Sequence, residues 1–461
     1  MIPAFVLRSV IVASQSFHRL CCYGPFLLVI FSSACTSSSS KGANNQQDTS
    51  LHIIQLPEPA QLAAAERQRI AAACQEFYDT MLKPKGFNGG IIVAKGGNIV
   101  FEKYTGTGHI PGRDSITANT PFHVASVSKT FTAMAILKLA EEGKIKLDEE
   151  LSKYFPKFNY PGITIRTLLS HRSGLPNYAY FMEDLGWDKN TWMTNLDMFS
   201  WMTLNKSLIQ NIGVPNTRFT YCNTNYALLA LLVQVASGKE FAQYLKETFF
   251  DPLQMKNTFV FTTADSSRVI PSYDWKGRLM PFNFLDAVYG DKNVYTTCRD
   301  LLTWDRALKS GKLFKAETLQ EAYTPYSNEK PGVRNYGLGW HLNIYPTGKK
   351  IIYHNGWWHG NNAVFIRLLD EDASIILTGN RFTSAIYKAR KLANIFGNYD
   401  IPDEEEENGK STDSVLTQPL QAPLPASPFI KKTVSKKDSL LQDLLRDKHR
   451  EAEIKRGKKL G

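Results

Sequence analysis

The chain has 461 residues, of which 43% are hydrophobic and 12% aromatic, so it can bury one large two-lobed domain or two ordinary ones. Its net charge is +11, but residues 431–461 hold 11 Lys and Arg against 5 Asp and Glu, which is more than half of the excess. The rest has no basic stripe interleaved with aromatic residues, and this argues against nucleic-acid binding.

The first 35 residues are typical of a targeting segment. Arg8 and Arg19 precede a short apolar run at 26–31, which fits a signal sequence and is too short to span a bilayer. The small residues before Cys35 resemble a bacterial lipoprotein processing site, although Ser32 stands where Leu is usual. We therefore expect a lipid on Cys35 that anchors the protein in the bacterial cell envelope, facing the periplasm or the cell surface. The alternative is a cleaved leader and a secreted or periplasmic soluble protein.

A polar linker at 36–57 precedes the main domain, which we expect at 58–399. Hydrophobic periodicity predicts a helix at 60–80 and strands at 90–94 and 98–104, joined at Gly96-Gly97. Further strands are predicted at 351–353, 363–369 and 374–377, before a helix at 385–396, and several helices between Ser126 and Leu313. This order predicts an α+β fold: an antiparallel β-sheet flanked by terminal helices, with an inserted, mostly helical lobe.

The segment from Ser126 to Lys129 opens an apolar helical stretch and pairs a candidate nucleophile with a candidate base. Three residues along a helix place Lys129 on the same face as Ser126, and burial would favour the neutral amine that can take a proton. Ser-x-x-Lys also occurs at 38–41 and 327–330, but neither opens a helix. The alternative is that Ser126 or Ser128 caps the helix.

Tyr221 and Asn223 end a polar loop before an apolar helix that Gly238 closes, a place from which a phenol can point into a cleft. Tyr-x-Asn also occurs at Tyr326 and Tyr353, in less suitable contexts. The alternative is a packed aromatic at Tyr221 and a helix cap at Asn223.

The third motif, His354-Asn355-Gly356, lies on a predicted strand. Gly356 would let a substrate backbone approach, and the Trp357 amide could join the Ser126 amide in an oxyanion hole. A lone histidine is more often structural. The occurrence of Ser-x-x-Lys, Tyr-x-Asn and His-x-Gly in this order along the chain is a stronger signal of a catalytic site than any one of the motifs.

Together these motifs resemble the serine hydrolase family of class C β-lactamases, D-alanyl-D-alanine carboxypeptidases and related esterases. The resemblance covers about residues 60–398. It implies Ser126 as nucleophile, Lys129 as base, Tyr221 as proton shuttle to the leaving group, Asn223 as a ligand of the substrate carbonyl, and 354–357 as the strand wall. Supporting stretches are LLSHRSGLP (168–176), GKIKLDEELSKYFP (143–156), DPLQMKNT (251–258), GDKNVYTTCRDLLTWDRAL (290–308) and YGLGW (336–340).

The chain has His-Asn-Gly where the β-lactamase pattern has Lys-Thr-Gly. A fixed ammonium suits a β-lactam carboxylate, whereas imidazole is cationic only below a pKa of about 6.5. We therefore expect an ester or a D-amino-acid peptide of the peptidoglycan type as substrate. The alternatives are a class C-like β-lactamase and a non-catalytic penicillin- or peptidoglycan-binding protein. Cys222 and the pair Trp357-Trp358 indicate a site with a shape of its own.

No cofactor or metal is expected, because His341, His354 and His359 lack the spacing and the carboxylate or Cys company of a zinc site. Beyond Cys35 the three remaining cysteines, an odd number, argue against a disulfide framework. The segment 400–461 is charged and rich in Pro and Ser, which is typical of disorder, with a short amphipathic helix at 439–454. The alternative for this tail is contact with anionic lipid or a partner.

Overall fold

The structure is a computed structural model that describes residues 52–110, 112, 114–399 and 401. The expected signal segment with Cys35, most of the linker and nearly all of the charged tail lie outside the described residues. Among the residues described, no helix is both long and apolar enough to cross a bilayer.

A seven-stranded antiparallel sheet runs in the order β2-β1-β12-β11-β10-β9-β8. Gly96 and Gly97 both have positive φ in the turn between the first two strands, as their pairing in the sequence predicts. The strands are β1 (Gly89–Lys95), β2 (Asn98–Thr105), β8 (Arg334–Tyr336), β9 (His341–Ile344), β10 (Lys350–Trp358), β11 (Asn361–Leu368) and β12 (Ala373–Gly379).

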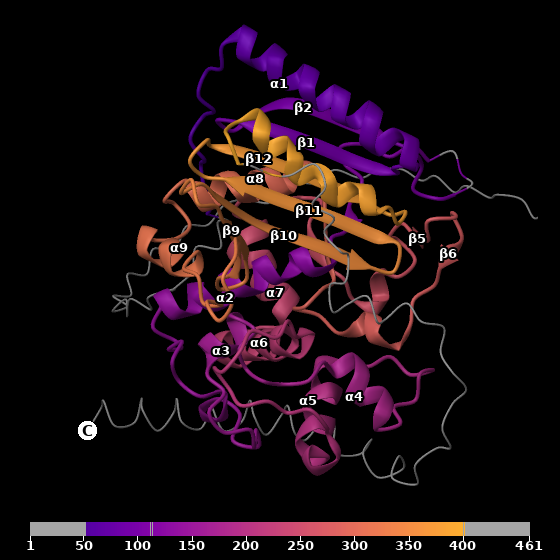
Figure 1. Ribbon diagram of the computed structural model, residues 1–461. Helices are drawn as coiled ribbons and strands as arrows, with labels where there is room; N and C mark the ends of the chain where they lie inside the picture. Colours follow the sequence, from indigo (N-terminus) through magenta and orange to yellow (C-terminus); the bar gives the residue numbers. More distant parts are fainter. Residues whose placement is uncertain (1–51, 111, 113, 400, 402–461) are drawn as a thin grey trace, which may run out of the picture. The chain divides into compact units, whose positions relative to one another are not determined.

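Both faces of this sheet are covered, as Figure 1 shows. Helix α1 (Ala64–Phe77) and the segment Ser384–Ile395 pack on one face, and the helical lobe packs on the other. Because side chains alternate along a strand, Val364 faces the first layer and Phe365 the lobe. The predicted helix at 385–396 is present, but as a 3₁₀ helix.

Helix α6 (Asn223–Ser237) lies inside the lobe and is buried along its whole length up to Val235. A helix that is apolar on all sides belongs in a core, and Gly238 ends it in the left-handed conformation. The other α-helices are α2 (Ser128–Glu141), α3 (Ile165–Leu169), α4 (Tyr178–Asp184), α5 (Asn195–Leu204), α7 (Phe241–Leu245), α8 (Cys298–Lys309) and α9 (Ala316–Ala322).

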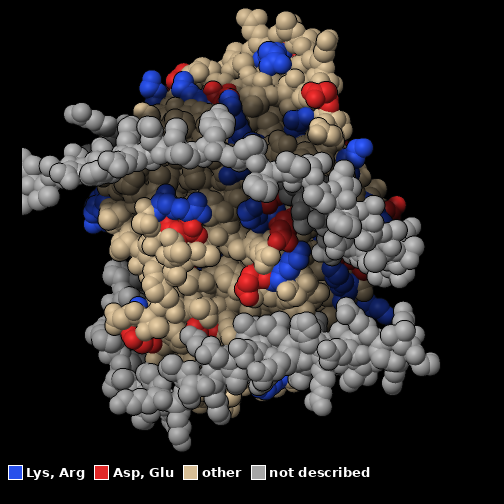
Figure 2. Space-filling view, turned by 180° about the vertical axis from the view of Figure 1, so that it is seen from behind, with Lys and Arg blue, Asp and Glu red and all other residues tan. Residues whose placement is uncertain are grey.

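Two small sheets complete the part of the chain that the structure describes. One has the order β3-β7-β4, with β3 (Phe122–His123), β7 (Val294–Thr296) and β4 (Phe259–Val260), and the other pairs β5 (Ser272–Tyr273) with β6 (Leu279–Met280). The predicted fold class is confirmed, while β8 and β9 were not predicted. On the face seen in Figure 2, Lys and Arg side chains lie in separate groups, several of them beside Asp or Glu.

Candidate active site

Ser126 lies in a tight turn between β3 and α2. The turn Ala125–Val127 is 3₁₀, and Ala125 has a φ of 46°, a conformation that costs a non-glycine residue energy and that its surroundings must enforce. The neighbouring Val124 is bonded on both sides: its N–H donates to the Val294 carbonyl and its carbonyl accepts from the Val127 N–H, each at 3.0 Å. The turn thus holds Ser126 just before the α-helix, which begins two residues later than the sequence predicted.

The structure brings Lys129 to Ser126. The Lys129 Nζ lies 2.9 Å from Ser126 Oγ and 2.8 Å from the Asp291 carbonyl oxygen, and the lysine side chain is fully buried. Helix α2 has Val127 as its N-cap and no side-chain cap, so neither serine caps it. Ser128 instead accepts a hydrogen bond from the Val294 N–H through its Oγ. The capping alternative is therefore wrong.

Tyr221 lies beside the same lysine. The Lys129 Nζ is 4.9 Å from the centre of the Tyr221 ring. Asn223 is buried as the first residue of α6, whose N-cap is Cys222 with no side-chain cap, so the alternative that Asn223 caps the helix is also wrong. Of the two other Tyr-x-Asn tyrosines, Tyr353 is buried in the core on the opposite face of the sheet.

A histidine that the sequence analysis did not single out packs against Tyr221. The rings of His171 and Tyr221 are 4.3 Å apart, and His171 Nδ1 accepts a hydrogen bond from the Cys222 N–H at 3.1 Å. Burial, and then the nearby Lys129, hold the pKa of His171 well below its usual value, so the ring is neutral. The stretch LLSHRSGLP was the only signal, and it gave the residue no role.

His354 is buried on β10 and both of its ring nitrogens have partners. Its Nδ1–H donates to the Asn355 carbonyl at 2.7 Å, so its Nε2 accepts from the Tyr336 hydroxyl at 3.3 Å. Burial, followed by the charges of His341 and Lys129, holds the pKa of His354 well below its usual value. At neutral pH this position carries an uncharged acceptor.

Gly356 lets β10 lie directly against the nucleophile turn. A Cβ on Gly356 would be 2.2 Å from the Val124 carbonyl oxygen and 3.1 Å from Ala125 Cβ. We expected this glycine to admit a substrate backbone, but the neighbour in the structure is the protein's own chain. The Trp357 ring packs on Phe382 with centres 5.1 Å apart. The oxyanion role expected of the Trp357 backbone amide stays a prediction.

His123 supports the turn from the other side. Its Nε2–H donates to Asn293 Oδ1 at 3.0 Å, which leaves Nδ1 to accept the Ala125 N–H at 3.2 Å. Asn293 has a φ of 78°, so it holds a conformation that asparagine tolerates better than most residues. Burial lowers the pKa of His123 to about 4, and the imidazole is neutral.

A buried polar network fixes the carbonyl that holds Lys129. The Tyr178 hydroxyl donates to Asp291 Oδ2 at 2.9 Å, and Lys292 Nζ lies 3.5 Å from the same oxygen. Because this side chain is tied down, the peptide of Asp291 presents its oxygen to the amine in one orientation. Within the described residues no cluster of three or more His, Cys, Asp and Glu could hold a metal ion. His359 nevertheless has a carboxylate neighbour, Asp286, from a distant segment.

Comparison with known proteins finds matches over most of the described chain. A family model described as Beta-lactamase matches residues 75–396. Penicillin-binding protein 4* of Bacillus subtilis (strain 168) is 30% identical over 359 residues, which cover 73% of this chain and 78% of that protein. Putative penicillin-binding protein PbpX of the same strain is 29% identical over 268 residues, covering 57% and 63%.

Solved structures agree with the fold. The penicillin binding protein from Bacillus halodurans has a TM-score of 0.61 and 25% identity, covering 68% of this chain and 98% of that one. The D-amino acid amidase from Ochrobactrum anthropi SV3, solved with L-phenylalanine amide, has a TM-score of 0.57 at 20% identity, covering 72% and 97%, and shows likeness of fold alone. The predicted family resemblance is confirmed.

Proposed function

The chain belongs to the beta-lactamase family, and we propose that it is a serine hydrolase that works through an acyl-enzyme on Ser126. The observation that carries this proposal is the buried Lys129 Nζ at 2.9 Å from Ser126 Oγ. A serine hydroxyl needs an adjacent base to become a nucleophile, and an amine beside it in a water-poor core can act as that base.

In the proposed reaction, Lys129 takes the hydroxyl proton as Ser126 Oγ bonds to the acyl carbon. The amides of Ser126 and Trp357 donate to the oxyanion, and Asn223 binds the substrate's carbonyl. Tyr221 passes a proton to the leaving group as the bond to the acyl carbon breaks. Water then attacks the acyl-enzyme through the same groups and returns the proton to Ser126.

We propose an ester or a D-amino-acid peptide of the peptidoglycan type as the substrate. The support is the state of His354, which is neutral where a β-lactamase of the Lys-Thr-Gly pattern has an ammonium. The name of the relative Penicillin-binding protein 4* favours a second candidate, a penicillin-binding protein that is acylated at Ser126 with little turnover. A lipid on Cys35 would keep either protein in the bacterial envelope, and this part rests on the sequence alone.

The test is covalent labelling of the purified protein with a fluorophosphonate and a labelled penicillin, followed by peptide mass mapping. Turnover is measured on nitrophenyl esters and a D-alanyl-D-alanine peptide. We expect the adduct on Ser126, and Ser126→Ala should lower the rate by a factor on the order of 10⁶. The matched control is Ser128→Ala, which removes a neighbouring buried hydroxyl and should keep the label.

An adduct on Ser128 or Cys222 would contradict the assignment of the nucleophile. Stable labelling by penicillin with no turnover of any ester or peptide would favour the penicillin-binding candidate over the hydrolase.

A further inference from the structure

The hairpin of β5 and β6 exposes large apolar side chains at its tip. Trp275 in the turn is 63% exposed and Leu279 on β6 is 60% exposed. Phe282, three residues further on, is also exposed, and its ring centre lies 5.9 Å from that of the exposed Trp192. Figure 1 shows β5 and β6 at one edge of the described domain, away from α9. Exposed apolar surface is thus gathered at one protruding hairpin.

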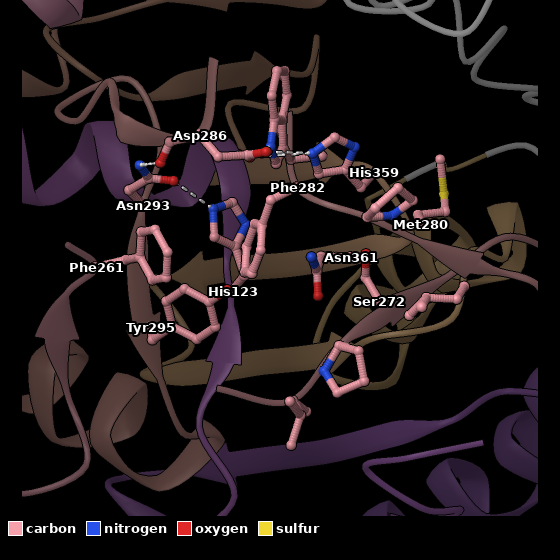
Figure 3. Close-up of a pocket in the computed structure, with 15 residues that line it drawn as sticks. His123, Phe261, Ser272, Met280, Phe282, Asp286, Asn293, Tyr295, His359 and Asn361 are labelled. Atoms are coloured by element: carbon pink, nitrogen blue, oxygen red, sulfur yellow. Dashed lines mark hydrogen bonds and ion pairs between the residues drawn. The ribbon is translucent and has the colours of Figure 1, made fainter. Parts of the chain in front are cut away.

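The root of this hairpin is attached to the main sheet. The Tyr273 N–H donates to the Asn380 carbonyl at 2.7 Å, and the Phe382 N–H donates to the Tyr273 carbonyl at 2.9 Å. On their inner side the two strands border a cavity of about 230 Å³, where Figure 3 shows Ser272 and Met280 among the lining side chains. Because the root is held by hydrogen bonds to a buried strand end, the tip has a fixed direction.

The turn at the tip is held by one carboxylate. Asp274 Oδ1 accepts the N–H groups of Lys276 and Arg278, each at 2.9 Å, and its Oδ2 accepts the Arg278 Nε–H at 2.6 Å. Gly277 has a φ of 80°, a conformation that glycine adopts without strain. Since the turn is formed before any partner arrives, binding at the tip would order little of the chain.

Cations surround the exposed tryptophan. Lys276 Nζ lies 4.7 Å from the centre of the Trp275 ring, and Arg381 donates to the Trp275 carbonyl at 2.9 Å. The Arg278 side chain is largely exposed although it pairs with Asp274. These three cations stand against the one carboxylate of the turn, so the tip is positively charged.

This combination of side chains suits a lipid surface better than a protein. Tryptophan favours the boundary between lipid and water, apolar side chains insert below the headgroups, and Lys and Arg attract anionic lipids. The tip at 275–279 has five residues, whereas a stable protein interface takes about 20–30 residues on each side. A bilayer has no fixed shape to match, so a small protruding tip is enough to enter it.

We propose that the tip of this hairpin, residues 275–279, docks on the surface of an anionic lipid bilayer. Trp275 and Leu279 insert at the boundary between lipid and water, and Lys276 contacts the headgroups. The proposal goes beyond the proposed hydrolase and depends neither on acylation of Ser126 nor on a lipid on Cys35.

The first experiment measures cosedimentation with vesicles of phosphatidylglycerol and phosphatidylcholine in equal parts. The protein is the full chain with Cys35→Ser, so that no lipid anchor contributes and the leader and basic tail are the same in every variant. Trp275→Ala and Leu279→Ala should each weaken binding by at least about 5-fold, because each removes a large apolar side chain from the lipid. Leu208→Ala is the matched control, since Leu208 is 62% exposed outside the hairpin, and it should bind as the wild type does.

Charge is tested at the lysine of the turn. One cation near an anionic membrane surface contributes about 5-fold to binding, so the charge reversal in Lys276→Glu should weaken it by about 25-fold. Lys312→Glu makes the same change in net charge at an exposed position between α8 and α9 and should have a much smaller effect. Vesicles of phosphatidylcholine alone should bind the wild type at least about 10-fold more weakly.

The second experiment locates the inserted residue. Lipids with brominated chains quench tryptophans that enter the bilayer, so they should quench the wild type. Trp275→Phe keeps an aromatic ring and should still bind, but most of the quenching should disappear.

Three results would overturn the proposal: equal losses of binding in Trp275→Ala and Leu208→Ala, equal binding to vesicles without anionic lipid, or unchanged quenching in Trp275→Phe. A wild-type dimer in sedimentation velocity that Trp275→Ala makes monomeric, without any binding to vesicles, would identify a second copy of the chain as the partner instead.

Discussion

His123 links pH to the integrity of the nucleophile turn. The ring is 3% exposed and burial lowers its pKa to about 4. Its Nδ1 accepts the Ala125 N–H, so protonation would set two N–H groups against each other one residue before Ser126. In an unfolded chain the imidazole titrates near 6.5. Between pH 6.5 and 4 the unfolded chain therefore binds a proton at this histidine and the folded chain does not. As a result, the free energy of unfolding falls as the pH falls.

The size of this effect follows from the two pKa values. While the pH lies between the folded and the unfolded pKa, each further pH unit lowers the free energy of unfolding by about 1.4 kcal/mol. Lowering the pH from 7 to 5 should therefore cost about 2 kcal/mol through His123, whose folded pKa is about 4. Protonation of the folded ring should break the bond to the Ala125 N–H and loosen the turn, so acylation should slow as the pH approaches 4.

The assay is urea unfolding at pH 7, 6 and 5 of the wild type, His123→Gln and His52→Gln. Gln at position 123 can donate and accept as the imidazole does but does not titrate, so its free energy of unfolding should fall by about 2 kcal/mol less than that of the wild type. His52 is exposed, and its variant should follow the wild type. Parallel curves for wild type and His123→Gln, or an NMR midpoint for His123 near 6.5, would refute the reasoning.

Three further predictions concern the lysine, the strand histidine and the C-terminal tail. Lys129→Arg should lose nearly as much activity as Lys129→Ala in steady-state assays, because a guanidinium stays protonated and cannot take the serine proton. His354→Lys should lower the free energy of unfolding by a few kcal/mol, because the new ammonium would be buried near Lys129. The same variant should not hydrolyse a chromogenic cephalosporin any faster than the wild type. Deleting 402–461 should leave ester hydrolysis within about 3-fold and the melting temperature within about 2 °C, whereas a cut before Tyr399 should lower the melting temperature, because Tyr399 and Ile401 are buried against the outer helices.

Each of these has a control and a contrary outcome. Activity retained in Lys129→Arg would mean that the lysine acts only through its charge. His354→Gln, which stays uncharged, should be milder than His354→Lys, and a stable lysine variant that hydrolyses the cephalosporin would restore the β-lactamase alternative. A fall in melting temperature after deletion of 402–461 would show that the tail packs on the domain.

Local patterns predicted most of the sheet. Strands such as β1 and β12 are apolar on both faces and end at glycines, and this signal lies within a few residues. By contrast β8 and β9 are three and four residues long and include Arg334, His341 and Asn343, so no alternation could be read from them. Strand β10 was predicted over three residues and spans nine, because its second half pairs with β11 through His354 and Asn355 rather than through an apolar run.

Separation along the chain also explains which contacts of the site could be predicted from the sequence. Ser126 and Lys129 are three residues apart, so one turn of helix brings them together and the sequence shows it. His171 reaches Cys222 across 51 positions and His123 reaches Asn293 across 170. Such contacts are made by the packing of the lobe on the sheet, and nothing in a single sequence marks them.

The charge of His354 depends on its surroundings as well as on its residue type. The sequence analysis expected an imidazole that is cationic only at acid pH. Burial lowers its pKa further, and the structure leaves it neutral with Tyr336 as hydrogen-bond donor. An anchor for a substrate carboxylate at this strand position is thereby lost. Selectivity must then come from contacts with the rest of the acyl group.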